Sequence, residues 1–421
     1  MPDLLRFATA GSVDDGKSTL IGRLLYDSKT VLQDQLEAVE RTSSDRGDDY
    51  TNLSLLTDGL RAEREQGITI DVAYRYFSTP ARSFIVADTP GHVQYTRNMV
   101  TGASTADLAL VLVDARKGVV EQTRRHASLS ALLRVPHLVL VVNKMDLVGF
   151  DQATYDDIVV DFRSFAGRLD VEDVTVVPVA ALHGDNVVTR SSRMPWYDGP
   201  ALLEHLEQVH VDRSGAASRG ARFPVQYVIR PMSVDWPDYR GYAGTLASGT
   251  LRSGDEVVVL PSGRRSTVAA VGTFDGPVDV ALAGQAVTVR LADDVDVSRG
   301  DMLVPAADQP RVTSSLDATV CWMSDAPLRP GQRVLVKHTT RTVKAAVQAL
   351  HDRLDVESLA RSNAAELGLN DIGRVTLRTA SPLFTDDYVT DRRTGAFLVI
   401  DEATGATAGA GMVGSTIGVR A

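Results

Sequence analysis

The sequence is poor in the features that define several classes of protein. Its 421 residues include a single cysteine, Cys321, so an internal disulfide and a cysteine-ligated metal cluster are excluded. We expect Cys321 to be a small buried apolar residue. No run reaches the roughly 18 to 20 apolar residues that a membrane-spanning helix needs, and the N-terminal apolar run is too short for a signal peptide. These absences predict a soluble, cytoplasmic protein without a membrane partner.

An excess of positive charge is also missing. The chain has 44 basic and 54 acidic side chains, for a formal net charge of -10. Residues 222–310 hold 8 basic and 11 acidic side chains, and residues 311–421 hold 13 and 12. Domains that bind nucleic acids usually concentrate lysine and arginine on one face. The charge balance therefore gives little support for a nucleic-acid partner.

The first half of the chain alternates short apolar runs with longer helical patterns, and its length suits two to four domains in all. The apolar runs are rich in valine and leucine at consecutive positions. Such strands are typical of a parallel sheet that helices cover on both faces. Residues 1–210 are therefore predicted to form a doubly wound, mostly parallel α/β domain. The clearest runs are residues 84–88, 108–115, 137–143 and 174–180.

The pattern changes after residue 210. Residues 211–221 are small, polar and rich in glycine and serine, which predicts a linker. Short strands separated by glycine, aspartate and proline follow, first over residues 222–310 and again over residues 311–421. Short strands with this punctuation are typical of β-barrels. The predicted architecture is an α/β domain followed by two β-barrel domains.

A phosphate-binding loop is predicted at "GSVDDGKST", residues 11–19, between an apolar strand and a helical pattern. In such a loop, glycines allow backbone N–H groups to point at phosphate oxygens. Lys17 would reach the β- and γ-phosphates, and the Ser18 hydroxyl would bind Mg²⁺. The residues predicted to contact the nucleotide are Gly11, Ser12, Val13, Asp14, Asp15, Gly16, Lys17, Ser18 and Thr19.

A second candidate element is "VADTPGH", residues 86–92, at the end of an apolar run. Ligands of open α/β sheets bind beyond the carboxyl ends of the strands. Asp88 would hold Mg²⁺ there, directly or through a water, and the Gly91 N–H would meet the γ-phosphate. Taken alone, a strand-end aspartate before Pro-Gly is also an ordinary turn. The phosphate loop in the same chain favours the metal-binding interpretation.

The base is predicted to be guanine because of "VVNKMDL", residues 141–147. A carboxylate at Asp146 would accept hydrogen bonds from N1–H and the N2 amino group of guanine, a pair of donors that adenine lacks. Asn143 would brace the base at N7, and the stem of Lys144 would cover the ring. The predicted nucleotide is GTP, bound with Mg²⁺.

These three motifs, in this order and spacing, resemble those of the translational GTPases. "REQGITID", residues 64–71, looks like the first switch loop of that family. The resemblance implies that Thr69 completes a Mg²⁺ shell with Ser18 and Asp88. It also implies that His92 positions the water that attacks the γ-phosphate, so Lys17, Thr69 and His92 are the expected catalytic residues.

The fifth nucleotide-binding loop departs from the family pattern. Its usual sequence is Ser-Ala-Leu, whereas this chain has Ala180, Ala181 and Leu182. By resemblance, the backbone N–H of Ala181 is expected at guanine O6. The serine hydroxyl that steadies the loop in the family is missing here.

Other segments resemble the GTPase subunit of the two-subunit ATP sulfurylase, also called sulfate adenylyltransferase. They are residues 27–63, "MPWYDGPALLEHLE", "LRPGQRVLVKHTTRTVKA" and "TDRRTGAFLVIDEATGATAGAGMV". The resemblance implies a hetero-oligomer in which a smaller catalytic subunit converts ATP and sulfate into adenosine 5′-phosphosulfate and pyrophosphate. This chain would hydrolyse GTP to drive that reaction. The given sequence has one phosphate loop, so an adenylylsulfate kinase step is not expected from it.

Two other functions stay open at this point. One is an elongation-factor-like translational GTPase that binds aminoacyl-tRNA, for which basic and aromatic residues should converge on the barrel faces. The other is a GTP-dependent scaffold that binds partners without coupling to chemistry. Hydrolysis stimulated by a partner and its substrates would argue against the scaffold.

Overall fold

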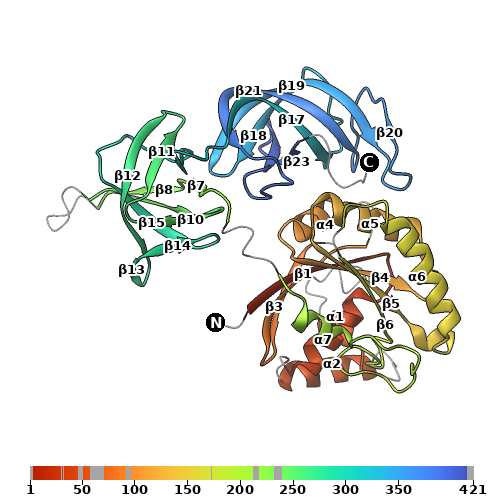
Figure 1. The fold of residues 1–421 in the computed structure, drawn as a ribbon. Coiled ribbons are helices and arrows are strands. Elements are labelled where there is room, and N and C mark those ends of the chain that lie inside the picture. The colour runs from red at the N-terminus through yellow and green to blue at the C-terminus, as the bar shows by residue number, and fades with distance from the viewer. Residues whose placement is uncertain are drawn as a thin grey trace. The chain divides into compact units, whose positions relative to one another are not determined.

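The computed structural model describes residues 3–29, 31, 33–45, 51–56, 71–91, 96–171, 173–211, 218–231 and 239–414. The chain divides into two compact units, of which the first comprises residues 1–211 with a short later segment, 356–360. Figure 1 shows the helices gathered in the first unit, while the labelled elements of the second unit are strands. Among the described helices, none has the length and apolarity that crossing a bilayer requires.

The first unit is built on a six-stranded sheet with the order β2-β3-β1-β4-β5-β6. β2 is antiparallel to β3, and the other neighbouring strands are parallel. All seven residues of β4 are buried, as expected for a strand that helices cover on both faces. The strands are β1 (Asp3–Gly11), β2 (Ala73–Ser78), β3 (Arg82–Asp88), β4 (Leu108–Asp114), β5 (His137–Asn143) and β6 (Asp173–Pro178).

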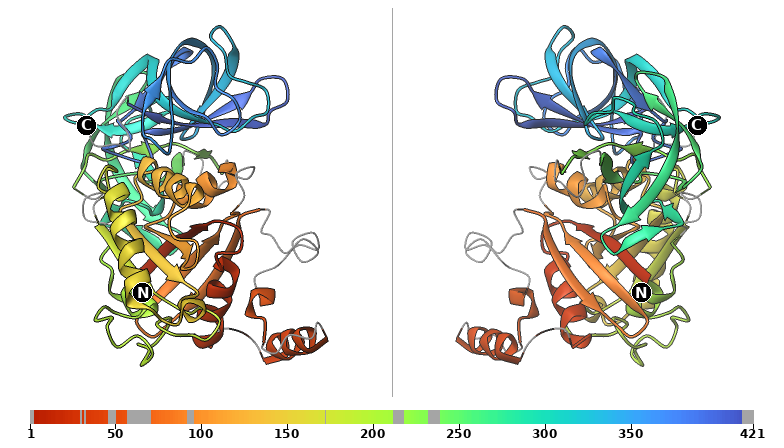
Figure 2. Two further views of the ribbon diagram at one scale, coloured as in Figure 1. Left: turned by 90° about the vertical axis from the view of Figure 1, so that its right-hand side faces the viewer. Right: turned by 90° about the vertical axis from the view of Figure 1, so that its left-hand side faces the viewer.

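Helices cover both faces of this sheet, which confirms the predicted doubly wound α/β domain. Figures 1 and 2 show α1 and α7 along one face and α4, α5 and α6 along the other. The helices are α1 (Lys17–Asp27), α2 (Gln33–Asp45), α4 (Thr96–Ala103), α5 (Glu121–Leu132), α6 (Gln152–Ala166) and α7 (Leu202–Gln208), with 3₁₀ turns η1 (Leu53–Leu56) and η3 (Met145–Val148). Because β1, β3, β4, β5 and β6 are parallel, their carboxyl ends meet at one edge of the sheet.

The second unit begins with a sheet of the order β7-β16-β11-β12-β15-β9-β8, to which β13 is added on β12. Its two end strands follow one another in the chain, so the sheet must curl until its edges meet. An isolated bridge between Arg222 and Ser248 lies on that seam, where Ala247 N donates to Arg222 O at 2.8 Å. The strands are β7 (Phe223–Pro224), β8 (Tyr227–Ile229), β9 (Gly241–Thr245), β11 (Glu256–Leu260), β12 (Arg264–Thr273), β13 (Gly276–Val278), β15 (Ala286–Leu291) and β16 (Met302–Pro305), and β10 (Thr250–Arg252) pairs with β14 (Val280–Leu282).

The rest of the second unit is a closed six-stranded barrel. Its strands follow the order β18-β22-β23-β17-β21-β19, and β19 pairs back to β18. Trp322 and Cys321 are both buried in β17, which confirms the expectation for the cysteine. The strands are β17 (Arg311–Trp322), β18 (Arg333–His338), β19 (Arg341–Leu354), β21 (Ile372–Thr385), β22 (Ala396–Asp401) and β23 (Thr407–Val413), with β20 (Arg361–Ser362) added on β19.

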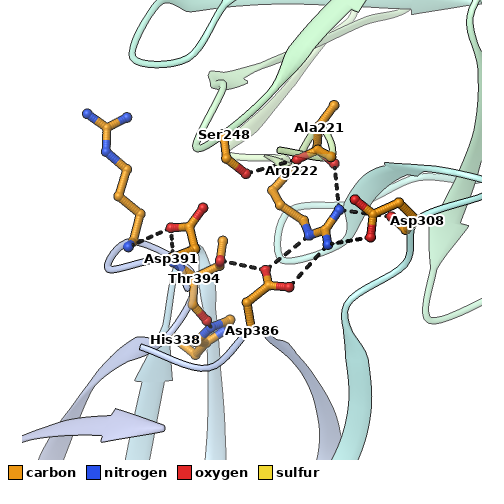
Figure 3. Close-up of polar contacts among 10 residues, drawn as sticks. Ala221, Arg222, Ser248, Asp308, His338, Asp386, Asp391 and Thr394 are labelled. Carbon is orange, nitrogen blue, oxygen red and sulfur yellow. Dashed lines mark hydrogen bonds and ion pairs between the residues drawn. The ribbon is translucent and has the colours of Figure 1, made fainter. Parts of the chain in front are cut away.

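The two barrels of the second unit meet at a polar cluster around Arg222 (Figure 3). The guanidinium of Arg222, whose side chain is 6% exposed, donates to both carboxylate oxygens of Asp386 at 3.0 and 3.1 Å. It also donates to Asp308 at 3.3 Å, while the Thr394 hydroxyl donates to Asp386 at 2.7 Å. An apolar cluster adjoins both barrels and consists of Val258, Leu260, Met302, Val304 and Phe384. Polar and apolar contacts thus both join the two barrels.

Candidate nucleotide-binding site

The predicted phosphate loop connects the carboxyl end of β1 to the first turn of α1. Asp14 and Gly16 have left-handed backbone conformations, with φ of 68° and 90°. A Cβ atom on Gly16 would lie 2.4 Å from Asn143 Nδ2, so only glycine fits there. The buried carboxylate of Asp15 accepts a hydrogen bond from Ser12 N at 2.6 Å. These contacts give the loop a defined shape at the N-terminus of a helix, a setting that favours anions.

Lys17 is buried beneath this loop. Its Nζ donates to Gly11 O at 3.0 Å and to Ser12 O at 2.8 Å. Burial lowers the pKa of Lys17, and the nearby carboxylates of Asp88 and Asp15 oppose that effect. A buried ammonium group is stabilised by anionic partners. The position of Lys17 therefore fits a site for phosphate oxygens.

Asp88 occupies the carboxyl end of β3, as predicted from its place in the sequence. It is 2% exposed, lies beside Thr9 of β1 and accepts a hydrogen bond from the Thr9 hydroxyl at 3.1 Å. Ser18 is the second residue of α1. Carboxylate and hydroxyl oxygens are donors that suit Mg²⁺, so both residue types fit the metal, and their roles as its ligands stay predictions.

Gly91 is packed against the phosphate loop. A Cβ atom on Gly91 would lie 2.6 Å from Lys17 Nζ and 2.8 Å from Gly11 O. The segment after Asp88 is therefore brought to the residues that are predicted to hold the phosphates. This is the juxtaposition that the sequence motifs predicted.

Asn143 links the phosphate loop to the loop that follows β6. Its Nδ2 donates to Asp15 O at 2.8 Å, and its Oδ1 accepts a hydrogen bond from Ala181 N at 3.0 Å. The predicted partner of the Ala181 N–H was guanine O6, whereas in the structure that group bonds to Asn143. To contact the base, the Ala181 N–H would have to donate to guanine O6 and to Asn143 Oδ1 at the same time. The base contacts of Asn143 and Ala181 stay predictions, and beside them Ala180 is buried and Leu182 is half-buried.

Lys144 extends from the end of β5 to the phosphate loop. Its backbone has φ of 63°, and its Nζ donates to Asp14 O and lies 3.1 Å from Asp114 Oδ2. This extended position suits a side chain whose stem covers a ring. Asp146, whose side chain is 16% exposed, has its Oδ2 3.7 Å from His183 Nε2.

Two residues that the family resemblance implies, Thr69 and His92, lie outside the described residues, as does most of the predicted switch loop. The metal-binding role of Thr69 and the water-positioning role of His92 therefore stay predictions.

Three family models match consecutive parts of the chain. The Elongation factor Tu GTP binding domain matches residues 2–212. The Elongation factor Tu domain 2 matches residues 242–304, and the GTP-eEF1A C-terminal domain-like model matches residues 315–414. These matches agree with the observed order of an α/β domain and two β domains.

Curated relatives cover nearly the whole chain. The bifunctional enzyme CysN/CysC of Mycobacterium tuberculosis is 61% identical over all of this chain and 69% of its own length. Sulfate adenylyltransferase subunit 1 of Laribacter hongkongensis is 52% identical over 98% of this chain and 85% of that protein. The same subunit of Aeromonas hydrophila is 53% identical over 97% of this chain and 86% of that protein. The chain belongs to the sulfate adenylyltransferase subunit 1 family.

This membership confirms the predicted relation to the translational GTPases, because the matched models are those of elongation factors. It also favours the sulfate adenylyltransferase subunit over the elongation-factor-like translational GTPase that the sequence left open. Two of the relatives above are named sulfate adenylyltransferase subunit 1 and the third is named CysN/CysC, and none of these three is named as a translation factor.

One buried residue beside the candidate site was not identified from the sequence. Asp114, at the end of β4, is buried and accepts hydrogen bonds from Arg116 Nε at 3.0 Å and Nη2 at 2.6 Å. Burial alone would raise the pKa of Asp114, but the hydrogen bonds from Arg116 and Lys144 hold that pKa well below its usual range. Asp114 thus orients Lys144. The available signal was its strand-end position in "LALVLVDA", the same signal that identified Asp88.

Proposed function

We propose that the chain is the GTP-hydrolysing subunit of a sulfate adenylyltransferase. The observation that supports this most is the convergence of the phosphate loop, residues 88–91 and residues 143–146 at one edge of the sheet. The two reported relatives that are named for this enzyme are 52% and 53% identical to the chain. GTP hydrolysis here would be coupled to formation of adenosine 5′-phosphosulfate and pyrophosphate from ATP and sulfate. That second reaction would take place on a smaller catalytic partner subunit.

The phosphates of GTP would be held by Lys17 and by backbone N–H groups of residues 11–19. Mg²⁺, held by Ser18, Thr69 and Asp88, would supply charge neutralisation at the β- and γ-phosphate oxygens. The Lys17 ammonium, already buried beside carbonyl oxygens, would keep its position and exchange part of its contact for phosphate oxygens. Little reorganisation of the loop is then needed when the nucleotide binds.

Hydrolysis would proceed by attack of water on the γ-phosphorus, with the bond to the GDP oxygen breaking. Such reactions depend mainly on positioning and charge stabilisation. His92 would orient the water, and the Gly91 N–H would donate to the γ-phosphate. Gly91 lies beside Lys17 and Gly11, which supports this role.

Guanine would be selected by Asp146 through two hydrogen bonds to its N1–H and amino groups. Lys144, fixed at Nζ by Asp14 O and Asp114, would cover the ring with its stem. Asn143 and the backbone of Ala180, Ala181 and Leu182 would enclose the remaining edge of the base. The specificity of the site then rests on donors and acceptors that two different loops supply.

GTP turnover with defined additions tests this function. The chain alone should hydrolyse GTP slowly, and addition of the smaller catalytic subunit with ATP and sulfate together should raise the rate and yield adenylylsulfate. Lys17→Ala is the matched control and should abolish both responses. No response to these additions, but stimulation by ribosomes with aminoacyl-tRNA, would support the translation-factor alternative instead.

A further inference from the structure

Helix α5 places the side chain of Gln122 beside Gly91. His126 lies one helical turn further along α5 and contacts Gln122. Gln122 Nε2 lies 3.3 Å from Gly91 O and 2.9 Å from His126 Nε2. His126 is 2% exposed, and Gln122 is half-buried. A helix from another part of the chain therefore contacts the segment that is proposed to meet the γ-phosphate.

The direction of these hydrogen bonds follows from chemistry. Gly91 O can only accept, so the Gln122 amide nitrogen must face it, and the second N–H of the same group points at His126. His126 Nε2 then accepts, which leaves the imidazole proton on Nδ1. Burial, with smaller effects from Lys17 and Arg125, lowers the pKa of His126 to about 3. The ring is therefore neutral near pH 7, as an acceptor must be.

His126 is held without a second hydrogen bond. Within the part of the chain that the structure describes, its buried Nδ1 has no hydrogen-bond partner. Burial of an unpaired polar group costs stability. A leucine would fill this position at lower cost, so the imidazole is better explained by the bond that it accepts from Gln122.

The bond from Gln122 to Gly91 O restrains the backbone of a residue that lies beside the phosphate loop. A Cβ atom on Gly91 would lie 2.6 Å from Lys17 Nζ and 2.8 Å from Gly11 O, so the glycine is packed closely there. The carbonyl belongs to the peptide plane after Gly91 and the N–H to the plane before it, so the bond from Gln122 acts on the N–H through the two backbone dihedrals of Gly91. The orientation of its N–H relative to the phosphate loop is thereby limited.

We propose that Gln122, oriented by His126, is a positioning residue that sets the Gly91 backbone so that its N–H donates to the γ-phosphate. Gln122 thus makes the site prefer GTP to GDP, because GDP lacks the phosphate that this N–H would meet. The inference rests on the proposed GTP-hydrolysing function and adds the element that reads the third phosphate.

Two substitutions of similar size separate this role from packing. Gln122→Met keeps the volume and removes the donor, and Gln122→Glu keeps the shape but places a carboxylate against the Gly91 carbonyl. Glu121→Gln, an exposed change on the same helix, is the matched control. Binding of GDP and of a non-hydrolysable GTP analogue is measured for each full-length variant, with GTP turnover in the presence of the partner subunit, ATP and sulfate.

Both Gln122 variants should weaken binding of the GTP analogue by about tenfold, the effect of one lost hydrogen bond, and leave GDP binding within about twofold of the parent. Turnover at saturating GTP should fall by about tenfold or more, since the Gly91 contact also orients the transferred phosphate. His126→Leu should lower the ratio of GTP-analogue affinity to GDP affinity in the same direction. Glu121→Gln should leave both affinities and the turnover rate unchanged.

An unchanged ratio of GTP-analogue to GDP affinity in both Gln122 variants would overturn the proposal, as would an equal loss for both nucleotides. A variant that fails to fold would lose GDP binding too, and the other variant then decides the question. Failure of the proposed function is distinguishable, because the parent chain itself would then show no stimulated GTP turnover.

Discussion

Polar side chains of the nucleotide site bond largely to backbone atoms of neighbouring loops. Lys17 donates to Gly11 O and Ser12 O, and Asn143 donates to Asp15 O. Lys144 Nζ donates to Asp14 O. Each of these bonds fixes a side chain before any ligand arrives, which lowers the entropy that binding must lose.

The base-reading role is tested by Asp146→Asn. The amide presents one acceptor and one donor, which matches the N1–H and C2 carbonyl of xanthine better than the two donors of guanine. GTP affinity should fall about 10²-fold or more, and xanthosine triphosphate should become the better ligand. Isothermal titration with both nucleotides measures the change. Unaltered GTP affinity would show that Asp146 does not read the base.

The water-positioning role is tested by His92→Ala. Removal of one positioning group should slow hydrolysis by about 10²-fold and leave GTP binding nearly unchanged, because the imidazole acts mainly in the transition state. Single-turnover hydrolysis and nucleotide titration separate these quantities. A normal hydrolysis rate would assign His92 to an ordinary loop.

Elements buried on both faces were the most predictable from the sequence. Residues 137–143 were predicted as a strand and form β5 over that same range, because consecutive apolar residues have no other favourable place than the centre of a covered sheet. The run "FPVQYVIR", residues 223–230, is divided into β7 and β8. The chain passes there from one edge of the curled sheet to the other, and no local pattern indicates such a change.

Other features could not be predicted because they depend on distant partners or on unusual turns. β18 and β19 are joined by a tight turn in which Thr339 has φ of 49°, although the sequence has no glycine or asparagine there. Gln122 and Gly91 are 31 positions apart, and only the folded sheet brings them together. The domain boundaries near residues 210, 222 and 310 stay predictions.

The buried imidazole of His126 in α5 should make the free energy of unfolding depend on pH. The pKa of His126 is about 3 in the folded chain and would return to its ordinary 6.5 on unfolding. Between pH 3 and pH 6.5 the unfolded chain binds more protons than the folded chain. The contribution of neutral His126 to the free energy of unfolding is therefore fully present above pH 6.5. It falls as the pH decreases, by up to about 1.4 kcal/mol per pH unit.

Urea unfolding at pH 7.0 and pH 5.5 checks this effect against His126→Gln. The parent chain should lose about 1 kcal/mol more than the variant over that interval. Other buried histidines, such as His338, titrate equally in both proteins and cancel in the comparison. An identical loss in the two proteins would mean that His126 is not buried in its neutral form.

The polar cluster around Arg222 (Figure 3) joins the two barrels into one compact unit. Arg222→Met removes the guanidinium from Asp386, a carboxylate whose side chain is 15% exposed. Loss of one partner from such a pair should cost about 2 to 4 kcal/mol of the unfolding free energy. Chemical denaturation measures it.

Arg311→Met is the matched control for that prediction. Its ion pair with Asp387 is longer, at 3.5 Å, and both side chains are largely exposed. Exposed pairs contribute about 1 kcal/mol at most. Equal effects of the two substitutions would mean that the Arg222 cluster does not stabilise the unit.

In the proposed function, the guanine nucleotide bound by this chain drives adenylylsulfate formation on its partner. The most direct measurement is adenylylsulfate formation by the Asp146→Asn variant with the catalytic subunit, ATP and sulfate, supplied with either GTP or xanthosine triphosphate. We predict that xanthosine triphosphate restores product formation and that GTP does not. Product formed equally with both nucleotides, or with neither added, would contradict the claim, because the nucleotide site of this chain would then not control the reaction.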